Sequence, residues 1–493
     1  MDSKLFKYVL IPLAVILIGQ RFFHLYTFVE NPHSWRQLDT LFYAYDFYKN
    51  GIDLFAPSVS WMGNYKTVVL EFPILAVILS FTFYLPGDEI VWMRVICFLM
   101  FLLSALYFYK LVKLFNTGTL ASFSAIVYLL IPLSVYYSRA LIIDFAVMLC
   151  SIAMIYYYVR AADEDSVKFI IIGSLFAVIG CLMKVPYMFV GYIATGLYCI
   201  SNKRLKFGIK YLYLFIIPVV VFLVWQVYIS NVNNLAPDWF FIPDYFKFTG
   251  MSSWYFGNLS DRLDWGNWNN LIMRGGASVI TFIGFALFIP GVFVRKAGID
   301  KRIFNYYSIG LLLYLLIFLK LNFIHDYYQI PFIAAVSFYI GVTLEYIYRK
   351  LESESVAKAI IVTAVSLVIL GINGIWFTER WYYKPDPVRI EASKIIREIT
   401  SQEDLIITSI VDTDPRDSRL NSPSYRYGWS IRQSDLSAGM LDSLQKNGAN
   451  YLILISNEAE IDQPLKEYLS KSVKKGEKML KSDPSRKIYI YKF

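Results

Sequence analysis

Long apolar runs separated by short polar loops occupy the first 380 residues of the chain. A helical run must be about 20 residues long to cross a hydrocarbon core of about 30 Å. Runs approaching or exceeding this length, the fifth and sixth being short, lie near residues 6–29, 91–114, 119–137, 141–160, 167–183, 186–200, 208–229, 273–294, 303–322, 328–348 and 357–378. The pattern predicts a polytopic α-helical membrane protein with about eleven transmembrane helices.

The pattern changes after Trp376, where short runs of β-branched and aromatic residues replace the long apolar ones. Such short runs are typical of strands, and the stretches between them have the spacing of helices. The sequence predicts strands at 405–412, 450–456 and 487–493 and helices at 391–400 and 435–447. We therefore expect a transmembrane domain over residues 1–380 and a small α/β domain over residues 385–493.

The composition supports the membrane assignment and excludes other classes of protein. Hydrophobic residues make up 57% of the chain and charged residues 17%, whereas soluble domains have about 25% charged residues. The net charge of +9 comes from basic residues scattered over short loops, so no basic face is expected to follow a nucleic-acid backbone. The four cysteines lie inside apolar runs without metal-ligand spacing, and we expect them to be small core residues.

Basic residues are concentrated in alternate loops, which the positive-inside rule assigns to the cytoplasm. They are Lys4, Lys7, Lys110, Lys113, Arg160, Lys168, Lys203, Arg204, Lys206, Lys210, Arg295, Lys296, Lys301, Arg302, Arg349, Lys350 and Lys358. The expected location is therefore the plasma (inner) membrane, with the N-terminus cytoplasmic and the C-terminal domain outside. No small-residue cleavage site follows the first run, so we expect a retained anchor rather than a signal peptide.

The first outer segment, residues 30–90, contains two stretches that are expected to be helical. Residues 36–50 place apolar side chains three and four positions apart, and such a helix is expected to lie along the membrane surface. Asp39 and Asp46 are seven residues apart and would share one face of this helix. The second stretch, residues 68–85, is expected to be another surface helix or a re-entrant segment.

Ionisable residues near the outer ends of the apolar runs form the candidate site. Placing one inside a membrane costs about 2.5–3.5 kcal/mol on insertion scales. Any single one can be explained as an interfacial side chain that reaches water. The topology nevertheless brings the whole set, from separate parts of the chain, to one face: Arg36, Asp39, Asp46, Glu71, Arg94, Arg139, Asp144, Lys184, His325 and Asp326. This convergence favours a functional site.

The chemistry of this set suits a phosphorylated lipid. The carboxylates of Asp39, Glu71 and Asp144 can act as a base or bind a divalent metal cation. The basic side chains that can hold a phosphate are those of Arg36, Arg139, Lys184 and His325. Tyr327 and Tyr328 are either aromatic-belt residues or hydrogen-bond donors to the same phosphate. Such a lipid would place its head group among the charges and leave its tail in the bilayer.

Five motifs, in order along the chain, resemble those of a known group of enzymes. They are "HSWRQLDT" at 33–40, "EFP" at 71–73, "YYSRALIIDF" at 136–145, "MKVPY" at 183–187 and "HDYYQIP" at 325–331. Over about residues 1–380 the chain resembles the C superfamily (GT-C) of membrane glycosyltransferases, in the branch of the protein O-mannosyltransferases and the lipid A aminoarabinose transferase. Asp46 has no counterpart in these motifs, so we expect it to be a solvated or capping charge.

This resemblance implies a polyprenyl-phosphate-linked sugar donor and transfer on the non-cytoplasmic face. Asp39 matches the position of the catalytic carboxylate, and Lys184 and Tyr328 match positions that contact the lipid phosphate. Glu71 and Asp144 match acidic positions, the first of which takes part in metal binding in some members. The first loop has Leu38-Asp39 in place of the Asp-Glu pair of the mannosyltransferases, so the resemblance by itself selects neither a mannose donor nor a protein acceptor.

The expected reaction is an inverting transfer to the hydroxyl group of a glycan, lipid or protein acceptor. Asp39 would take the acceptor proton, and polyprenyl phosphate would depart while basic side chains neutralise its charge. The candidates for this neutralisation are Arg139, Lys184 and His325, whereas Arg36 would orient Asp39 or the sugar. A divalent metal cation is a cofactor of some enzymes of this type but not of others.

Two other classes of membrane protein stay open at this point. A transporter or flippase of a charged or lipid-linked substrate would use similar polar residues, but it predicts charges near mid-span and internal repeats. Here the charges lie at the ends of the runs, and no repeat is visible. A structural or sensory protein would leave the outer charges without a role. The sequence therefore favours a transferase over both.

Overall fold

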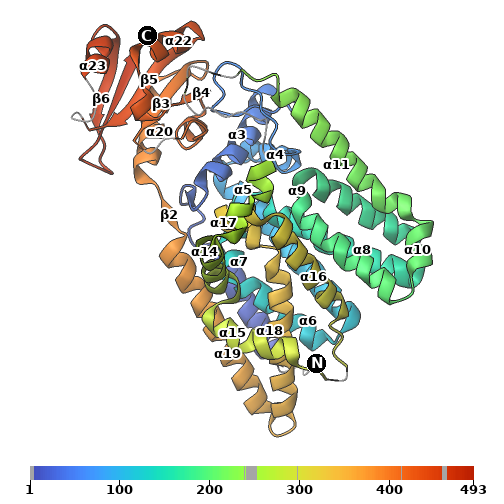
Figure 1. Cartoon of the computed structure of the whole chain (residues 1–493). Coiled ribbons are helices and arrows are strands. Elements are labelled where there is room, and N and C mark those ends of the chain that lie inside the picture. Colours follow the sequence, from blue (N-terminus) through green and yellow to red (C-terminus); the bar gives the residue numbers. More distant parts are fainter. Residues whose placement is uncertain are drawn as a thin grey trace. The chain divides into compact units, whose positions relative to one another are not determined.

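The computed structural model describes residues 5–237, 239, 242, 252–296, 298–411, 414–457 and 463–493, and Figure 1 shows its elements. The chain forms two compact units. The helical unit comprises Met1–Tyr26, Arg94–Gln226 and Met251–Tyr383, and the sheet unit comprises Thr27–Met93, Val227–Gly250 and Lys384–Phe493. The first outer segment, which we expected to belong to the transmembrane domain, thus shares a compact unit with the C-terminal residues.

Helices build the helical unit. Those that lie wholly or mostly in it are η1 (Phe6–Leu10), α2 (Ile11–Gln20), α5 (Glu89–Phe115), α6 (Gly118–Leu130), α7 (Pro132–Tyr137), α8 (Asp144–Glu164), α9 (Val167–Ser201), α10 (Leu205–Lys210), α11 (Leu212–Asn233), α12 (Ser252–Phe256), α13 (Leu259–Leu263), α14 (Trp265–Gly275), η3 (Gly276–Ile280), α15 (Phe282–Phe293), α16 (Arg302–Ile317), α17 (Leu319–Ile324), η4 (Asp326–Gln329), α18 (Phe332–Glu352) and α19 (Val356–Trp381). Hydroxyl side chains cap three of them, because Thr117, Thr281 and Ser355 each accept a hydrogen bond from the backbone N–H three residues later.

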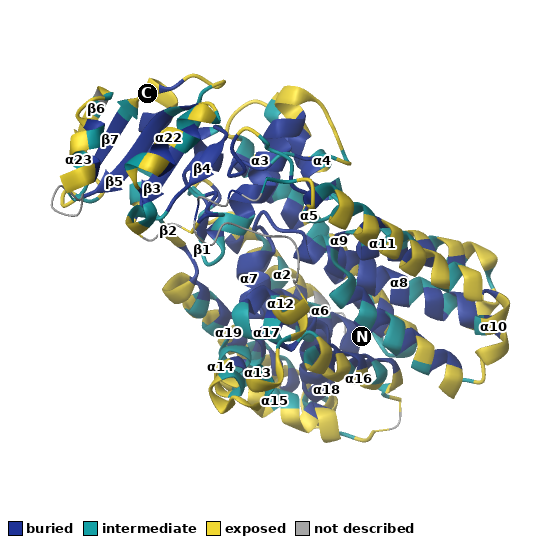
Figure 2. Cartoon of the chain, turned by 45° about the horizontal axis from the view of Figure 1, so that its top comes forward, coloured by how far each residue is buried: buried dark blue, intermediate teal, exposed yellow. Residues whose placement is uncertain are grey.

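Several of these helices are suited to a membrane. Within the described residues, those long and apolar enough to cross one are Glu89–Phe115, Asp144–Glu164, Val167–Ser201, Leu212–Asn233 and Val356–Trp381. A sixth span results if Trp265–Ile280 and Phe282–Phe293, bent by 86°, are counted together, and four further apolar helices are shorter. Helix α11 exposes apolar side chains along its length, as expected of a helix that faces lipid (Figure 2). The protein is therefore polytopic, and the count of eleven spans stays a prediction.

Helix α9 is interrupted at Lys184, whose backbone is extended, with φ −161° and ψ 87°. Pro186 follows two residues later, and a proline inside a helix removes a backbone hydrogen bond and clashes with the preceding turn. A straight helix of 35 residues would be about 52 Å long, far more than the thickness of a hydrocarbon core. The interruption falls between the two runs, 167–183 and 186–200, that the hydropathy pattern separated.

Glycines allow the closest helix contacts in the helical unit. A Cβ atom added to Gly374 in α19 would lie 2.3 Å from the backbone oxygen of Leu130, at the end of α6. One added to Gly310 in α16 would lie 2.8 Å from the backbone oxygen of Val190 in α9. Small residues at such crossings let helix backbones approach closely, which strengthens van der Waals packing within a membrane.

A five-stranded sheet forms the C-terminal part of the sheet unit. Its strands are β3 (Leu405–Ile410), β4 (Gly428–Ser430), β5 (Ala449–Ser456), β6 (Val473–Met479) and β7 (Lys487–Lys492), arranged in the order β4-β3-β5-β7-β6. Strand β3 is parallel to β4 and β5, whereas β7 is antiparallel to β5 and β6. The three runs predicted as strands correspond to β3, β5 and β7. Strands β4 and β6 were missed, because β4 is very short and β6 carries mostly charged residues.

Helices cover both faces of this sheet (Figure 1). They are α20 (Pro387–Ile399), α21 (Asn421–Ser424), η5 (Gln433–Asp435), α22 (Ala438–Lys446) and α23 (Gln463–Leu469). Successive strand residues point to opposite faces, so Ile406 packs in the core beneath α20 and Ile407 packs in the core that includes α22 and α23. The second core also contains Trp61 and Met62 from the first outer segment. The sheet is thus buried against residues from a distant part of the sequence.

The first outer segment contributes β1 (Glu30–Asn31), α3 (Ser34–Asn50), α4 (Ile74–Ser80) and η2 (Phe81–Tyr84) to the sheet unit. Strand β1 pairs antiparallel with β2 (Lys384–Pro385). Residues 37–47 of α3 are all buried, so the burial is not confined to one amphipathic face of this helix (Figure 2). Asp39 is among these buried residues, and its burial affects the ionisation of its carboxyl group.

Replacing Gly374 by alanine is expected to lower the melting temperature of the purified protein. The added methyl group meets a backbone oxygen that no side-chain rotation can move, and such overpacking costs about 1–3 kcal/mol. Gly196→Ala in α9 is the matched control, since its added Cβ has no neighbour within 4 Å and alanine favours a helix. Equal melting temperatures for the two variants in detergent would contradict the close α19–α6 contact.

Candidate functional site

The candidate residues fall into two groups, one in each compact unit. Arg36, Asp39 and Glu71 lie in the sheet unit. The helical unit contains six further candidates: Arg139, Asp144, Lys184, His325, Tyr327 and Tyr328. Each group has contacts of its own, and these contacts define what each can do chemically.

Asp39 lies in the second turn of α3 and is buried. Its Oδ1 atom accepts a hydrogen bond of 3.1 Å from the indole Nε1 of Trp61. The uncharged side chain of Ser418 also acts on this carboxylate and favours its ionised form. Both groups are uncharged, so they orient the carboxylate without neutralising it.

Arg36 precedes Asp39 by one helical turn and forms an ion pair with Glu71 through Nη2 and Oε2. Both side chains are largely buried, and Glu71 stands directly before the short segment that leads into α4. A buried carboxylate or guanidinium is costly unless it is paired, so each of these side chains stabilises the other. The positive charge of Arg36 also acts on Asp39.

Burial raises the pKa of the Asp39 carboxyl from its ordinary value of 3.8 to about 7. The charge of Arg36, the hydrogen bond from Trp61 and the side chain of Ser418 act in the opposite direction, because they favour the ionised form. The negative charge of Glu71 adds to the rise. A carboxyl group with a pKa near neutral pH is suited to take and hold a proton in that range.

Lys184 and Asp144 are paired in the helical unit, with 2.6 Å between Nζ and Oδ1. Asp144 is the first residue of α8, and Lys184 occupies the break in α9. The hydroxyl group of Tyr187 hydrogen-bonds to Asp144 and lies 2.6 Å from the carbonyl oxygen of Tyr327. One turn of α9 thereby joins the charged pair to the turn that contains Tyr327.

Three tyrosine rings surround the Lys184 ammonium group. Its Nζ atom lies 3.9 Å from the ring centre of Tyr328 and 4.6 Å from those of Tyr187 and Tyr327. A cation over an aromatic face is attracted by the ring quadrupole, and more strongly where water is excluded. We call these three residues the tyrosine box. The box holds a positive charge beside hydroxyl groups that can donate hydrogen bonds to an anion.

His325 and Asp326 fix the turn that supplies two rings of the tyrosine box. The imidazole of His325 stacks on Tyr327, with 5.1 Å between ring centres and 8° between ring planes. Asp326 accepts a hydrogen bond of 2.6 Å from the hydroxyl group of Tyr137 and another from that of Tyr382. Asp326 is therefore an anchor of η4, a role that the sequence did not suggest.

Arg139 donates a hydrogen bond to the protein backbone. Its Nη1 atom donates to the carbonyl oxygen of His24 at 3.0 Å, and its guanidinium lies 4.7 Å from the ring centre of Tyr383. Arg94 donates to the same carbonyl oxygen at 2.9 Å. Both arginines thus hold the chain that follows the first apolar helices.

Asp46 differs from the expectation that it is solvated. It is buried, and its Oδ1 atom accepts hydrogen bonds from Asn50 Nδ2, at 2.7 Å, and from the hydroxyl group of Tyr427. Tyr427 precedes β4 and lies 381 residues away along the chain. Contacts of this range leave no signal in local spacing, which is why the sequence suggested exposure.

The expected metal ligands do not form a metal site. Within the part of the chain that the structure describes, no group of three or more His, Cys, Asp or Glu side chains could hold a metal ion. Glu71 is paired with Arg36, and Asp144 is paired with Lys184. A hard cation prefers several oxygen ligands without competing cations, so these residues do not fit one.

Sequence reasoning missed the hydrogen-bond partners of the candidate residues. Trp61 and Ser418 carry no motif, and they lie far from Asp39 in the sequence. Tyr187 follows Lys184 by three residues, but the backbone is extended at Lys184, so helical spacing does not predict their contact. Tyr137 lies in the "YYSRALIIDF" motif, but nothing local indicates that it binds Asp326.

Comparison with known families finds a match to part of the chain. The family model described as dolichyl-phosphate-mannose-protein mannosyltransferase matches residues 71–228, which is less than half of the chain. The matched segment contains three of the five motifs, those at 71–73, 136–145 and 183–187. Among curated proteins, no sequence matches the chain.

Solved structures with the same fold extend the comparison to nearly the whole chain. ArnT from Cupriavidus metallidurans bound to undecaprenyl phosphate is similar with a TM-score of 0.63 and 13% identity, over 97% of each chain. The apo state of that protein gives a TM-score of 0.62 at 13% identity, also over 97% of each chain. An Archaeoglobus fulgidus oligosaccharyltransferase in complex with Zn and sulfate gives 0.59 at 12% identity, over 90% of this chain and 67% of that chain. The resemblance inferred from the motifs is confirmed.

Replacing Asp39 by asparagine is expected to raise thermal stability more at pH 8 than at pH 5. The carboxyl group ionises near pH 3.8 in the unfolded chain and near pH 7 in the folded one. Between these two pH values the folded state binds more protons than the unfolded state. The free energy of unfolding therefore falls as the pH rises, by about 1.4 kcal/mol per pH unit. Asparagine has no such proton equilibrium. Melting temperatures of both proteins at both pH values test this, and a difference independent of pH would contradict the raised pKa.

Proposed function

We propose that this chain transfers a sugar from a polyprenyl-phosphate-linked donor to an acceptor hydroxyl group. The premise is that it has the fold, and a sequence segment, of the C-superfamily membrane glycosyltransferases. The observation that carries the proposal is the burial of Asp39 beside the Trp61 indole and the charge of Arg36, an environment that places its pKa near neutral pH. Transfer is proposed to occur on the outer face of the membrane, to a glycan, lipid or protein acceptor.

The tyrosine box is the proposed contact for the donor phosphate. In support, ArnT, which has a similar fold, was solved with undecaprenyl phosphate bound. Lys184 supplies a positive charge, and the rings of Tyr328 and Tyr327, which carry hydroxyl groups, lie beside it. The apolar helices of the unit are compatible with a donor whose hydrocarbon tail stays in the bilayer.

The charge on the donor explains why a lysine would accelerate the reaction. A sugar joined to polyprenyl phosphate is a phosphodiester with one negative charge, whereas the departing polyprenyl phosphate is a monoester that gains a second one. A cation near the phosphate therefore binds the transition state more tightly than the donor, and only such a difference raises the rate. Lys184 is assigned this role, with His325 as a further donor of positive charge when protonated.

Asp39 is assigned to the acceptor end of the reaction. Its carboxylate takes the proton of the acceptor hydroxyl group while that oxygen attacks the anomeric carbon of the sugar. The bond between this carbon and the phosphate oxygen breaks, the bonding electrons leave with the phosphate, and the configuration at the anomeric carbon inverts. Arg36, held by Glu71, stabilises the carboxylate form of Asp39. Because the acidic residues do not fit a metal ion, no step uses one.

Asp39→Asn is expected to lower the rate of sugar transfer by about 10²- to 10⁴-fold, since it removes the general base. Purified protein in lipid is supplied with a panel of radiolabelled undecaprenyl-phosphate sugars and with envelope glycans and lipids as acceptors. Binding of undecaprenyl phosphate should be unchanged. Asp46→Asn is the matched control, because it alters a second buried carboxylate of the same helix.

The same assay separates the transferase from a transporter or flippase. Wild-type transfer by folded Asp39→Asn protein would refute the assignment of Asp39. Movement of labelled donor across vesicle membranes without formation of a glycosylated product would favour transport over transfer.

Removing the charge of Lys184 is expected to weaken binding of undecaprenyl phosphate at least tenfold, since hydrogen bonds to charged groups contribute about 1.5–3 kcal/mol. Lys184→Met alone would leave Asp144 unpaired in a buried place, so the double variant with Asp144→Asn is measured beside it. Lys184→Arg should retain part of the affinity. Lys320→Met, which removes a lysine paired with Asp261, is the control. Unchanged binding by the folded double variant would exclude Lys184 from the phosphate site.

A further inference from the structure

We propose that the C-terminal sheet positions the catalytic carboxylate of Asp39, through Ser418 directly and through a docked loop that carries Trp61. This inference rests on the proposed role of Asp39 as the general base. It assigns to the C-terminal sheet a part in the reaction itself, beyond any part in holding an acceptor. Three sets of contacts within the sheet unit support it.

The first set joins Ser418 to the start of α3. Its hydroxyl group donates a hydrogen bond of 2.7 Å to the carbonyl oxygen of Trp35, and its side chain favours the ionised form of Asp39. Trp35 and Asp39 are four residues apart and therefore lie on one face of the helix. The hydroxyl proton is donated to Trp35 in this structure, and rotation about the Cβ–Oγ bond can turn it toward Asp39 when the carboxylate ionises.

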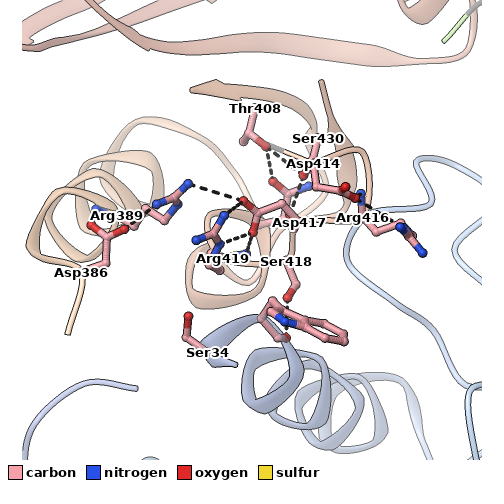
Figure 3. Close-up of polar contacts among 12 residues, drawn as sticks. Ser34, Asp386, Arg389, Thr408, Asp414, Arg416, Asp417, Ser418, Arg419 and Ser430 are labelled. Atoms are coloured by element: carbon pink, nitrogen blue, oxygen red, sulfur yellow. Dashed lines mark hydrogen bonds and ion pairs between the residues drawn. The ribbon is translucent and has the colours of Figure 1, made fainter. Parts of the chain in front are cut away.

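The second set holds Ser418 in place through its neighbour Asp417 (Figure 3). Arg419 binds both carboxylate oxygens of Asp417, with Nε to Oδ1 and Nη2 to Oδ2 distances of 2.7 Å each. Arg389, from α20, lies 3.5 Å from the same carboxylate. The backbone oxygen of Asp417 accepts a hydrogen bond from the hydroxyl group of Ser430 in β4. Helix α20 and strand β4 thus hold the backbone at Asp417, and the Ser418 side chain extends from this backbone to α3.

The third set holds the loop that carries Trp61. The backbone N–H of Gly428, at the start of β4, donates to the carbonyl oxygen of Ser60 at 2.9 Å. The side-chain amide of Asn421 donates to the same oxygen at 3.1 Å. On the other side of Trp61, the backbone N–H of Gly63 donates to the carbonyl oxygen of Gly428 at 2.7 Å. The loop is therefore paired with the edge of the sheet on both sides of the tryptophan.

Gly63 is required for this close docking. Its φ angle is +59°, a conformation that other residues rarely adopt, and a Cβ atom added to it would lie 2.0 Å from the indole of Trp429 in β4. Trp429 is itself fully buried in the core that contains Trp61. The position of the Trp61 indole is therefore set by the sheet.

The groups that face Asp39 show what Trp61 and Ser418 do. The charged groups acting on it are Arg36, on its own helix, and Glu71, while the phenol of Tyr43 lies one turn along. The charge of Arg36 stabilises the ionised carboxylate, Glu71 partly offsets it, and Trp61 and Ser418 are the uncharged groups that stabilise it further. They are positioning residues, since neither is assigned a contact with substrate.

The test measures the ionisation of Asp39 itself in the full-length protein. A pH titration followed by infrared absorption of the protonated carboxyl group, with Asp39→Asn subtracted, gives the midpoint. Ser418→Ala and Trp61→Phe should each raise this midpoint by about one pH unit, because each removes a polar group that stabilises the charged form. In the transfer assay, both should lower kcat at pH 7 and leave KM for the donor unchanged.

Two further variants distinguish an effect on the ionisation of Asp39 from a loss of structure. Ser418→Thr keeps the hydroxyl group and should restore the wild-type midpoint. Ser424→Ala removes another buried hydroxyl group of the same region, which bonds to the carbonyl oxygen of Leu420, and should leave the midpoint unchanged. An unshifted midpoint in folded Ser418→Ala and Trp61→Phe overturns the inference even if Asp39→Asn abolishes transfer. Full transfer by Asp39→Asn overturns the proposed function on which it rests.

Discussion

The cost of removing charged groups from water is the constraint on which both groups of candidate residues depend. Buried charges persist when a partner compensates them. Lys184 and Arg36 are each compensated by a carboxylate in direct contact. Asp39 is treated differently, because its hydrogen bonds come from neutral donors and its burial is only partly offset. Full neutralisation would give a stable structural ion pair, whereas this incomplete compensation leaves a carboxyl group that exchanges its proton near neutral pH.

Local pattern predicted the long apolar helices and part of the sheet, but not the contacts that define their chemistry. Hydropathy separated the two parts of α9 at Lys184, and strand propensity located β3, β5 and β7 but missed β4 and β6. The motif at 325–331 led to three residues of the helical unit that do lie together. The donors to Asp39 and the burial of Asp46 could not be predicted, because their partners are hundreds of residues away or lie in loops without periodicity.

The interruption of α9 links backbone geometry to charge. A lysine inside a continuous apolar helix would have to reach past its neighbours to find water or an anion. At Lys184 the backbone is extended, and the proline that follows two residues later prevents the ordinary hydrogen bond. The same residue that breaks the helix is thereby aimed at Asp144 and at three tyrosine rings. Breaking a membrane helix is costly, and here the break serves to place one cation.

The sheet unit is assembled from three separated stretches of sequence, and this has a consequence for biosynthesis. Trp35 and Ser418, which are joined by a hydrogen bond, are 383 residues apart. During synthesis α3 leaves the ribosome long before β3, β4 and the segment around Asp417 exist. Until then its buried face has no cover, and the surroundings of Asp39 are incomplete. A nascent or prematurely terminated chain therefore lacks the surroundings that set the ionisation of Asp39 in the folded protein.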